Sequence, residues 1–109
     1  MDKTFTSPFS SLWNKYRPAV VKMMTEAVNG PQTYKLFPHE VKALDQKART
    51  FKFTLRVENS KPVATPKDSV IGSDLFHALT LSNKAKELMQ QHVYEFTLDR
   101  DFTLSVSIA

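Results

Sequence analysis

The sequence predicts an α+β fold in two layers, a mainly antiparallel four-stranded sheet with helices on one face. Apolar residues recur every three or four positions over residues 8–28, as on one face of a helix. Residues 50–58, 94–98 and 102–108 alternate apolar and polar side chains, as strands with one buried face do. The chain has 109 residues, which is room for one core, so we expect a single domain over residues 1–109.

The first helix has clear start and stop signals. Ser7 and Pro8 are typical of the N-cap and the first helical position. Gly30 and Pro31 are typical of the C-terminal end, because glycine accepts the left-handed conformation and proline cannot continue the helix. Pro18 falls on the polar side of the helix, where water can replace the lost hydrogen bond. We therefore expect a bend at Pro18 and not a break.

The later elements are shorter. Two brief helices are expected after residue 72, the first capped by Ser73 or Asp74 and the second by Ser82. Residues 41–48 are ambiguous and could form a helical turn or two. The expected order is helix 8–28, strand 32–37, turn 41–48, strand 50–58, two helices, strand 94–98 and strand 102–108.

Three segments are predicted to connect or to lie outside these elements. Residues 59–68 hold two prolines and several polar residues, which indicates a flexible loop. Residues 99–101 are expected to join the last two strands as a hairpin. Residues 1–6 are expected to be poorly ordered.

The charge is unevenly distributed along the chain. Twelve of the fifteen Lys and Arg residues precede Asp68 against five acids, a net +7, whereas the remainder carries −3. A basic surface attracts phosphate groups or acidic proteins. The part of this region that could form a compact patch supplies the candidate anion or nucleic-acid contacts, which are Lys42, Lys47, Arg49, Lys52 and Arg56.

Several classes of site are excluded by composition. With no cysteine there is no disulfide, thiolate nucleophile or cysteine-based metal site, and two glycines cannot build a Gly-rich phosphate loop. His39, His77 and His92 lack metal-ligand spacing. Asp74 lies one helical turn before His77 and could orient its imidazole, although a partly exposed helix histidine is the simpler interpretation. We expect no cofactor and no metal.

The chain is also expected to stay away from membranes. No run of 18 apolar residues is present, and the first residues do not form a secretory signal. These features favour a cytoplasmic protein.

The aromatic residues fall almost wholly at core-facing positions. Arg17 follows Trp13 by four residues, so its guanidinium could stack on the indole. The polar faces of the predicted strands carry no aromatic residue, so a nucleic-acid platform that stacks bases is not expected. A winged-helix reading of residues 74–109 is disfavoured because residues 82–109 sum to −1, which repels phosphate.

The preferred functional interpretation is a small non-enzymatic protein–protein interaction module, with a homodimer as one form. Opposite charges of two copies, or an unpaired strand edge such as that of residues 102–108, could join them. One alternative is weak, sequence-independent nucleic-acid binding through the basic region before Asp68. The other is an enzyme of a type that no motif reveals.

Overall fold

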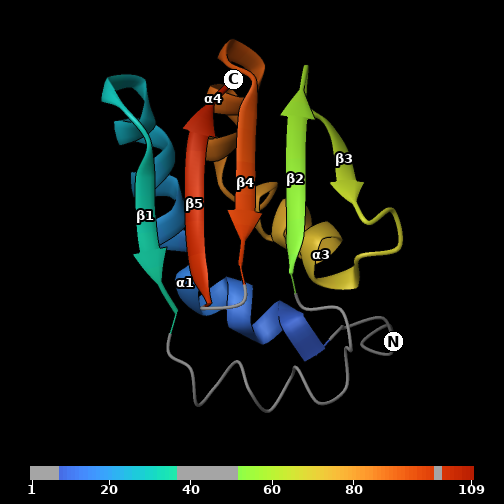
Figure 1. Cartoon of the computed structure of the whole chain (residues 1–109). Helices are drawn as coiled ribbons and strands as arrows, with labels where there is room; N and C mark the ends of the chain where they lie inside the picture. The colour runs from blue at the N-terminus through green and yellow to red at the C-terminus, as the bar shows by residue number, and fades with distance from the viewer. Residues whose placement is uncertain (1–7, 37–51, 100–101) are drawn as a thin grey trace.

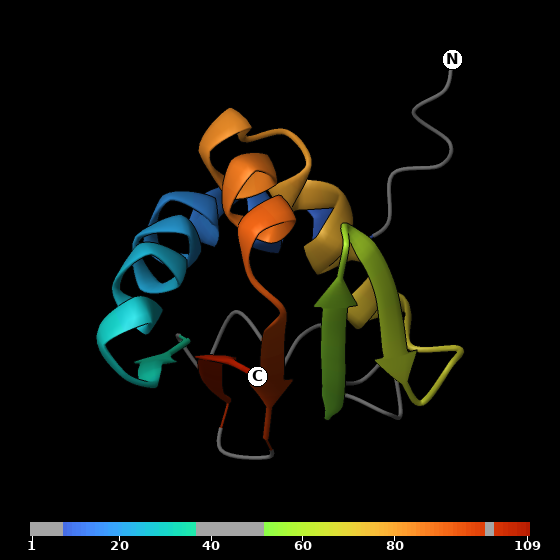
Figure 2. The same cartoon turned by 90° about the horizontal axis from the view of Figure 1, so that it is seen from above.

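The computed structural model describes residues 8–36, 52–99 and 102–109, with side chains from Leu12 onward. A layer of helices covers one face of an open antiparallel sheet of five strands (Figures 1 and 2). The elements are α1 (Pro8–Glu26), the 3-10 turn η2 (Ala27–Asn29), β1 (Gln32–Lys35), β2 (Phe53–Glu58), β3 (Lys61–Thr65), α3 (Val70–Leu79), α4 (Asn83–Gln91), β4 (Tyr94–Leu98) and β5 (Thr103–Ile108). The predicted α+β class and antiparallel sheet are confirmed.

The core lies between the sheet and the helices, as the alternation predicts. Phe53, Leu55 and Val57 of β2 are buried, and the residues between them are exposed. From the helical layer, α1 contributes the largest share of the buried side chains. The core residues of α1 are Leu12, Trp13, Tyr16, Val20, Met23 and Met24.

The prediction of four strands is wrong, because the segment expected as a flexible loop contains β3. Asn59 and Ser60 have φ values of 54° and 62°, so they form the tight turn of a hairpin between β2 and β3. Nearly every residue of β3 is exposed. A strand with no buried face does not alternate between apolar and polar residues, so β3 gave no strand signal. Pro62 also favoured a loop, because proline is rare in strands.

The expectation that the last strand has a free edge is also wrong. The strand order is β1-β5-β4-β2-β3, so β5 is paired on both sides, with β1 and with β4. Within the part of the chain that the structure describes, the edges of the sheet without a partner strand belong to β1 and β3 (Figure 1). Alternation reports which face of a strand is buried and says nothing of its neighbours.

The predicted helix signals agree with the structure in part. Pro18 lies within α1 on an exposed position, and α1 continues through it. Ser82 caps α4, accepting a hydrogen bond from the Ala85 amide at 3.2 Å. The first short helix begins earlier than predicted. Its cap is Ser69, whose hydroxyl accepts from the Gly72 amide at 3.1 Å.

Two long-range hydrogen bonds attach α1 to the rest of the fold. The buried Trp13 indole donates to the carbonyl of Ile71 in α3 at 2.9 Å. The Tyr94 hydroxyl of β4 donates to the carbonyl of Met24 at 2.9 Å. Arg17 does not stack on Trp13 and instead donates to Asn14 Oδ1 at 2.6 Å. The indole is fully buried and meets Phe53 edge-on, which leaves it no open face.

The ambiguous turn at 41–48 lies outside the described residues, as do Ser7, residues 1–6 and two residues of the predicted hairpin at 99–101. Among the helices that the structure describes, none combines the length and the apolar character needed to cross a membrane.

Candidate functional site

The predicted basic patch is described only in part. Lys42, Lys47 and Arg49 lie outside the described residues. Lys52 is exposed directly before β2, and Arg56 is exposed in the middle of that strand. The structure therefore describes two of the five candidate contacts, so whether all five converge on one surface is not tested.

Arg56 is held by two carboxylates. Its Nη1 atom donates to Glu95 Oε2 at 2.8 Å, and its Nη2 atom lies 3.5 Å from Glu58 Oε1. Arg56 and Glu95 are direct cross-strand partners of β2 and β4. A phosphate at this position would have to compete with both carboxylates. This arrangement weakens Arg56 as an anion contact.

The open face of the sheet is lined with hydroxyl groups. The register brings one residue from each strand into a single row, and each of them is serine or threonine. The row runs from β1 to β3 through Thr33, Ser105, Thr97, Thr54 and Thr65. Cross-strand hydroxyl pairs of this kind stabilise a solvated sheet face. The predicted absence of aromatic residues from this face is confirmed for the described strands.

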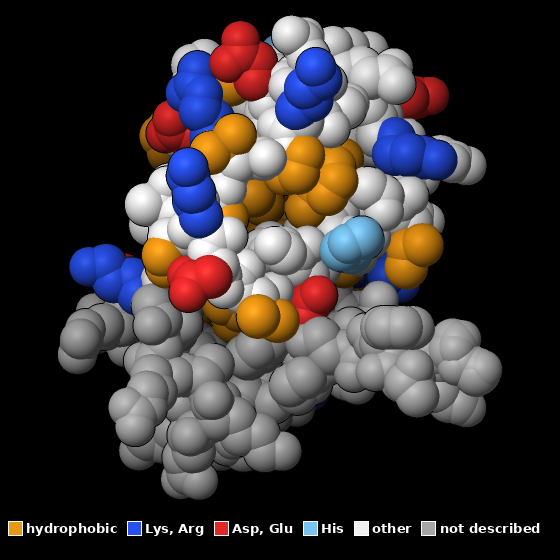
Figure 3. All heavy atoms as spheres, turned by 90° about the vertical axis from the view of Figure 1, so that its right-hand side faces the viewer, with side chains coloured by type: hydrophobic (Ala, Val, Ile, Leu, Met, Phe, Trp, Pro, Cys, Tyr) orange, Lys and Arg blue, Asp and Glu red, His pale blue; other side chains and the backbone are white. Residues whose placement is uncertain are grey.

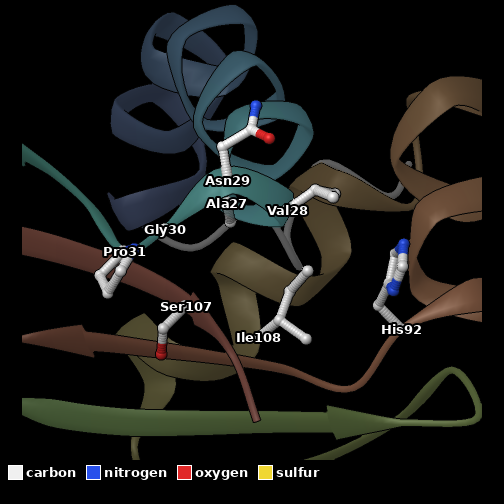
Figure 4. Close-up of a pocket in the computed structure, with 8 residues that line it drawn as sticks. All are labelled: Ala27, Val28, Asn29, Gly30, Pro31, His92, Ser107 and Ile108. Carbon is white, nitrogen blue, oxygen red and sulfur yellow. The ribbon is translucent and has the colours of Figure 1, made fainter.

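A hollow of about 490 Å³ opens at the end of α1 (Figure 4). Its lining comes from residues 27–31, from His92 after α4 and from two residues of β5. Val28 and Ile108 face the opening, whereas the hydroxyl of Ser107 points away, on the other side of β5. A ligand site needs polar groups that converge on one point, and these do not converge.

The two described histidines lie on different elements and belong to no group of side chains that could hold a metal ion. His77 is exposed on α3, and His92 is half-buried at the end of α4. Asp74 Oδ2 is buried and has no hydrogen-bond partner among the described residues. Those residues also show no hydrogen bond or ion pair between Asp74 and His77, so the suggested contact is not seen. Among the described residues no group of three or more His, Asp or Glu side chains could hold a metal ion. His39 lies outside those residues.

The side of the molecule formed by β3 and α3 carries exposed apolar side chains among charged ones of both signs. Figure 3 shows hydrophobic side chains gathered over the middle of this side, with both basic (Lys, Arg) and acidic (Asp, Glu) side chains around them. The large apolar residues most exposed near here come from different layers. Val63 pairs with Arg56 and so projects from the open face, whereas Val70 begins α3 in the helical layer. They do not share one face.

The backbone of β3 offers little to a partner strand. The bonds from Asp99 to Thr103 and from Ala109 to Val93 direct the odd-numbered residues of β4 toward β5. The bonding direction alternates along antiparallel strands, so the even-numbered residues of β4 bond to β2 and the even-numbered residues of β2 bond to β3. In β3 the backbone groups of Lys61, Val63 and Thr65 therefore point to β2, and those of the even-numbered residues point outward. Those outward residues of β3 are Pro62 and Ala64, and proline has no N–H. The free edge of β3 therefore has one amide donor.

The edge of β1 is different. The Leu36 amide donates to the Phe102 carbonyl at 2.9 Å, so Gln32, Tyr34 and Leu36 direct their backbone groups to β5. Thr33 and Lys35 consequently direct theirs outward, and both residues are exposed. Neither amide has a partner among the described residues, and no labelled element lies beyond β1 (Figure 1). This edge presents two complete donor–acceptor pairs, and we call it the β1 edge.

Sequence reasoning missed the β1 edge because it depends on which strand lies outermost. The chain places β1 far from β5 in sequence, and only the register shows that β5 is covered. The two prolines at 62 and 66 gave the only available signal for the opposite edge, since proline in a sheet is confined to edges.

The chain matches no protein-family model, no curated protein and no solved structure.

Proposed function

We propose that this protein is a small non-enzymatic protein–protein interaction module that binds an extended segment of another chain along the β1 edge. The observation that carries the proposal is the difference between the two free edges of the sheet. The β1 edge has the outward amides of Thr33 and Lys35, whereas β3 has the outward amide of Ala64 alone. An added strand is held by backbone hydrogen bonds, so unpaired donors and acceptors are what it requires.

The surroundings of the β1 edge support this proposal. Thr33 and Lys35 place their side chains on the open face beside Ser105 and Thr103, so a docked strand would meet hydroxyl groups and one ammonium group there. On the helical side it would meet the half-buried Tyr34. A segment with apolar residues toward the helices and polar or acidic residues toward the open face fits this edge.

A phage-displayed library of short peptides tests the proposal. Selected peptides should slow hydrogen exchange at the amides of Thr33 and Lys35 and leave the amide of Ala64 unchanged. Thr33→Pro removes an outward N–H without breaking a bond to β5, so it should abolish binding. Ala64→Pro makes the same change on the other edge and serves as the matched control. Equal binding by wild type and Thr33→Pro would refute strand addition at β1.

Nucleic-acid binding is the weaker proposal for this chain. Two of the candidate phosphate contacts are described. Arg56 is paired with two carboxylates, which leaves the exposed Lys52, before β2, as the described cation of this pair that a phosphate could reach without competing with them. Non-specific affinity for nucleic acid rises with the number of phosphates neutralised. We therefore expect no gel retardation of single- or double-stranded DNA at physiological salt. Retardation that Lys52→Glu reverses would restore this alternative.

A further inference from the structure

We infer that the partner of the β1 edge is a second copy of the same chain, joined antiparallel about a two-fold axis at Tyr34. This inference rests on the proposed function and names its partner. The join would link two five-stranded sheets into one continuous sheet of ten strands. Thr33 of one copy would then lie opposite Lys35 of the other, and each such pair would exchange two backbone hydrogen bonds.

Three two-fold registers are available to an edge this short, and two of them have a fault. An axis at Thr33 sets Lys35 opposite Pro31, which has no N–H to donate to the Lys35 carbonyl. An axis at Lys35 sets two ammonium groups on directly opposite residues, which is destabilising. The axis at Tyr34 pairs every outward donor with an acceptor and faces each lysine with a threonine.

The side chain at the centre of this register also suits a symmetric contact. Tyr34 is half-buried and meets Tyr16 of α1 edge-on, with ring centroids 5.8 Å apart. The two Tyr34 residues would form the non-hydrogen-bonded pair, in which opposite Cα atoms approach to about 4.5 Å. Because β1 is an outermost strand, part of each half-buried ring would be covered by the other ring. Aromatic pairs across strands are among the more stabilising cross-strand contacts.

The contrast between the two edges limits the size of the assembly. A two-fold contact uses the same strand of both copies and leaves only the β3 edges exposed. Those edges carry Pro62 and the exposed Lys61, which are devices that oppose further pairing. The assembly therefore closes at two copies.

Single cysteines test both the partner and the register, because the chain has no native cysteine. In the Tyr34 register, residues 33 and 35 of different copies lie about 5.5 Å apart between Cα atoms, within disulfide reach. Two copies of residue 33 lie roughly 8–9 Å apart, which is out of reach. A mixture of Thr33→Cys and Lys35→Cys should therefore form a cross-linked dimer on oxidation, and neither variant should cross-link alone. Ala64→Cys mixed with Thr33→Cys is the control for random collision.

The cross-linking pattern tests the register, and the cross-link in the mixture together with sedimentation tests whether the partner is a second copy. Cross-linking of Thr33→Cys alone or of Lys35→Cys alone would overturn the Tyr34 register. A strict monomer in sedimentation at every concentration, together with no cross-link in the mixture, would overturn the second copy as partner. The peptide experiment probes the same two amides, so it is run at a concentration at which the chain is monomeric in sedimentation. If peptides protect Thr33 and Lys35 while the chain stays monomeric, only the present inference fails, and if neither occurs the proposed function fails as well.

Discussion

At the scale of single residues, two polar atoms on large buried side chains fix how α1 sits on the fold. The Trp13 indole and the Tyr94 hydroxyl each donate to a main-chain carbonyl far away in the sequence, on Ile71 and Met24 respectively. Burying such groups is costly unless they are paired. Apolar periodicity predicted that both side chains belong to the core, but no sequence pattern names the carbonyl that each one meets.

Tyr94→Phe isolates one of these bonds. The ring keeps its packing against Phe96, while the Met24 carbonyl loses its side-chain donor. We expect the free energy of unfolding to fall by about 1–2 kcal/mol, measured by urea denaturation at neutral pH. Tyr34→Phe is the control, because Tyr34 is only half-buried, and it should change stability less. An unchanged midpoint for Tyr94→Phe would contradict the assigned role of the hydroxyl.

The same variant has a pH signature. Burial raises the pKa of Tyr94 above its ordinary value of 10.0, so the folded state holds this proton more tightly than the unfolded chain does. The resulting stability is complete below pH 10 and is lost as the pH rises through the higher folded-state pKa. The stability difference between wild type and Tyr94→Phe should therefore shrink above about pH 10. Denaturation curves on either side of that pH measure it, and a constant difference would contradict a buried neutral phenol.

At the scale of elements, the sequence predicted best where burial is one-sided and failed where it is absent. β2 and β4 alternate buried and less buried residues along their length, and both were predicted. β3 has no buried residue, so its sequence does not alternate between apolar and polar side chains. Its prolines favoured a loop instead. The predicted start of α3, with Ser73 or Asp74 as its cap, is wrong because the helix begins at Val70 and its cap is Ser69. Only the geometry shows that Ser69 reaches an amide.

The candidate site was predictable to a similar extent. The polar, aromatic-free open face follows from alternation alone, but the pairing of Arg56 with Glu95 depends on β2 lying beside β4. Strand order also decides which edges are free. A single sequence constrains the strand order weakly, because β1 could pair with any strand that has the same alternation of apolar and polar side chains.

The cap of α4 gives a test at this scale. Ser82→Ala removes the acceptor for the Ala85 amide and should lower the free energy of unfolding by about 1 kcal/mol, read from chemical denaturation. Ser82→Asp keeps an acceptor and adds a charge that favours a helix N-terminus, so it should retain the wild-type stability. If alanine and aspartate behave alike, the hydroxyl is not acting as the cap.

At the scale of the whole molecule, the sheet is open at both sides, yet its sides are unequal. An antiparallel sheet with two receptive edges can add chains without limit, and one with a single receptive edge stops at two. In this fold a single proline makes the difference, because Pro62 occupies one of the two outward positions of β3. We propose that Pro62, which favoured a loop over a strand in the sequence, also keeps the β3 edge from pairing.

Pro62→Val tests this account of the whole assembly. Valine restores the outward N–H at residue 62 and suits a strand, so β3 gains a second outward donor beside that of Ala64. We expect the variant to form species larger than a dimer that grow with concentration, measured by light scattering, while wild type levels off at two copies. Adding Thr33→Pro removes an outward N–H from the β1 edge, so it should limit growth to pairs joined through β3. If Pro62→Val stays the same size as wild type at every concentration, proline is not what closes this edge.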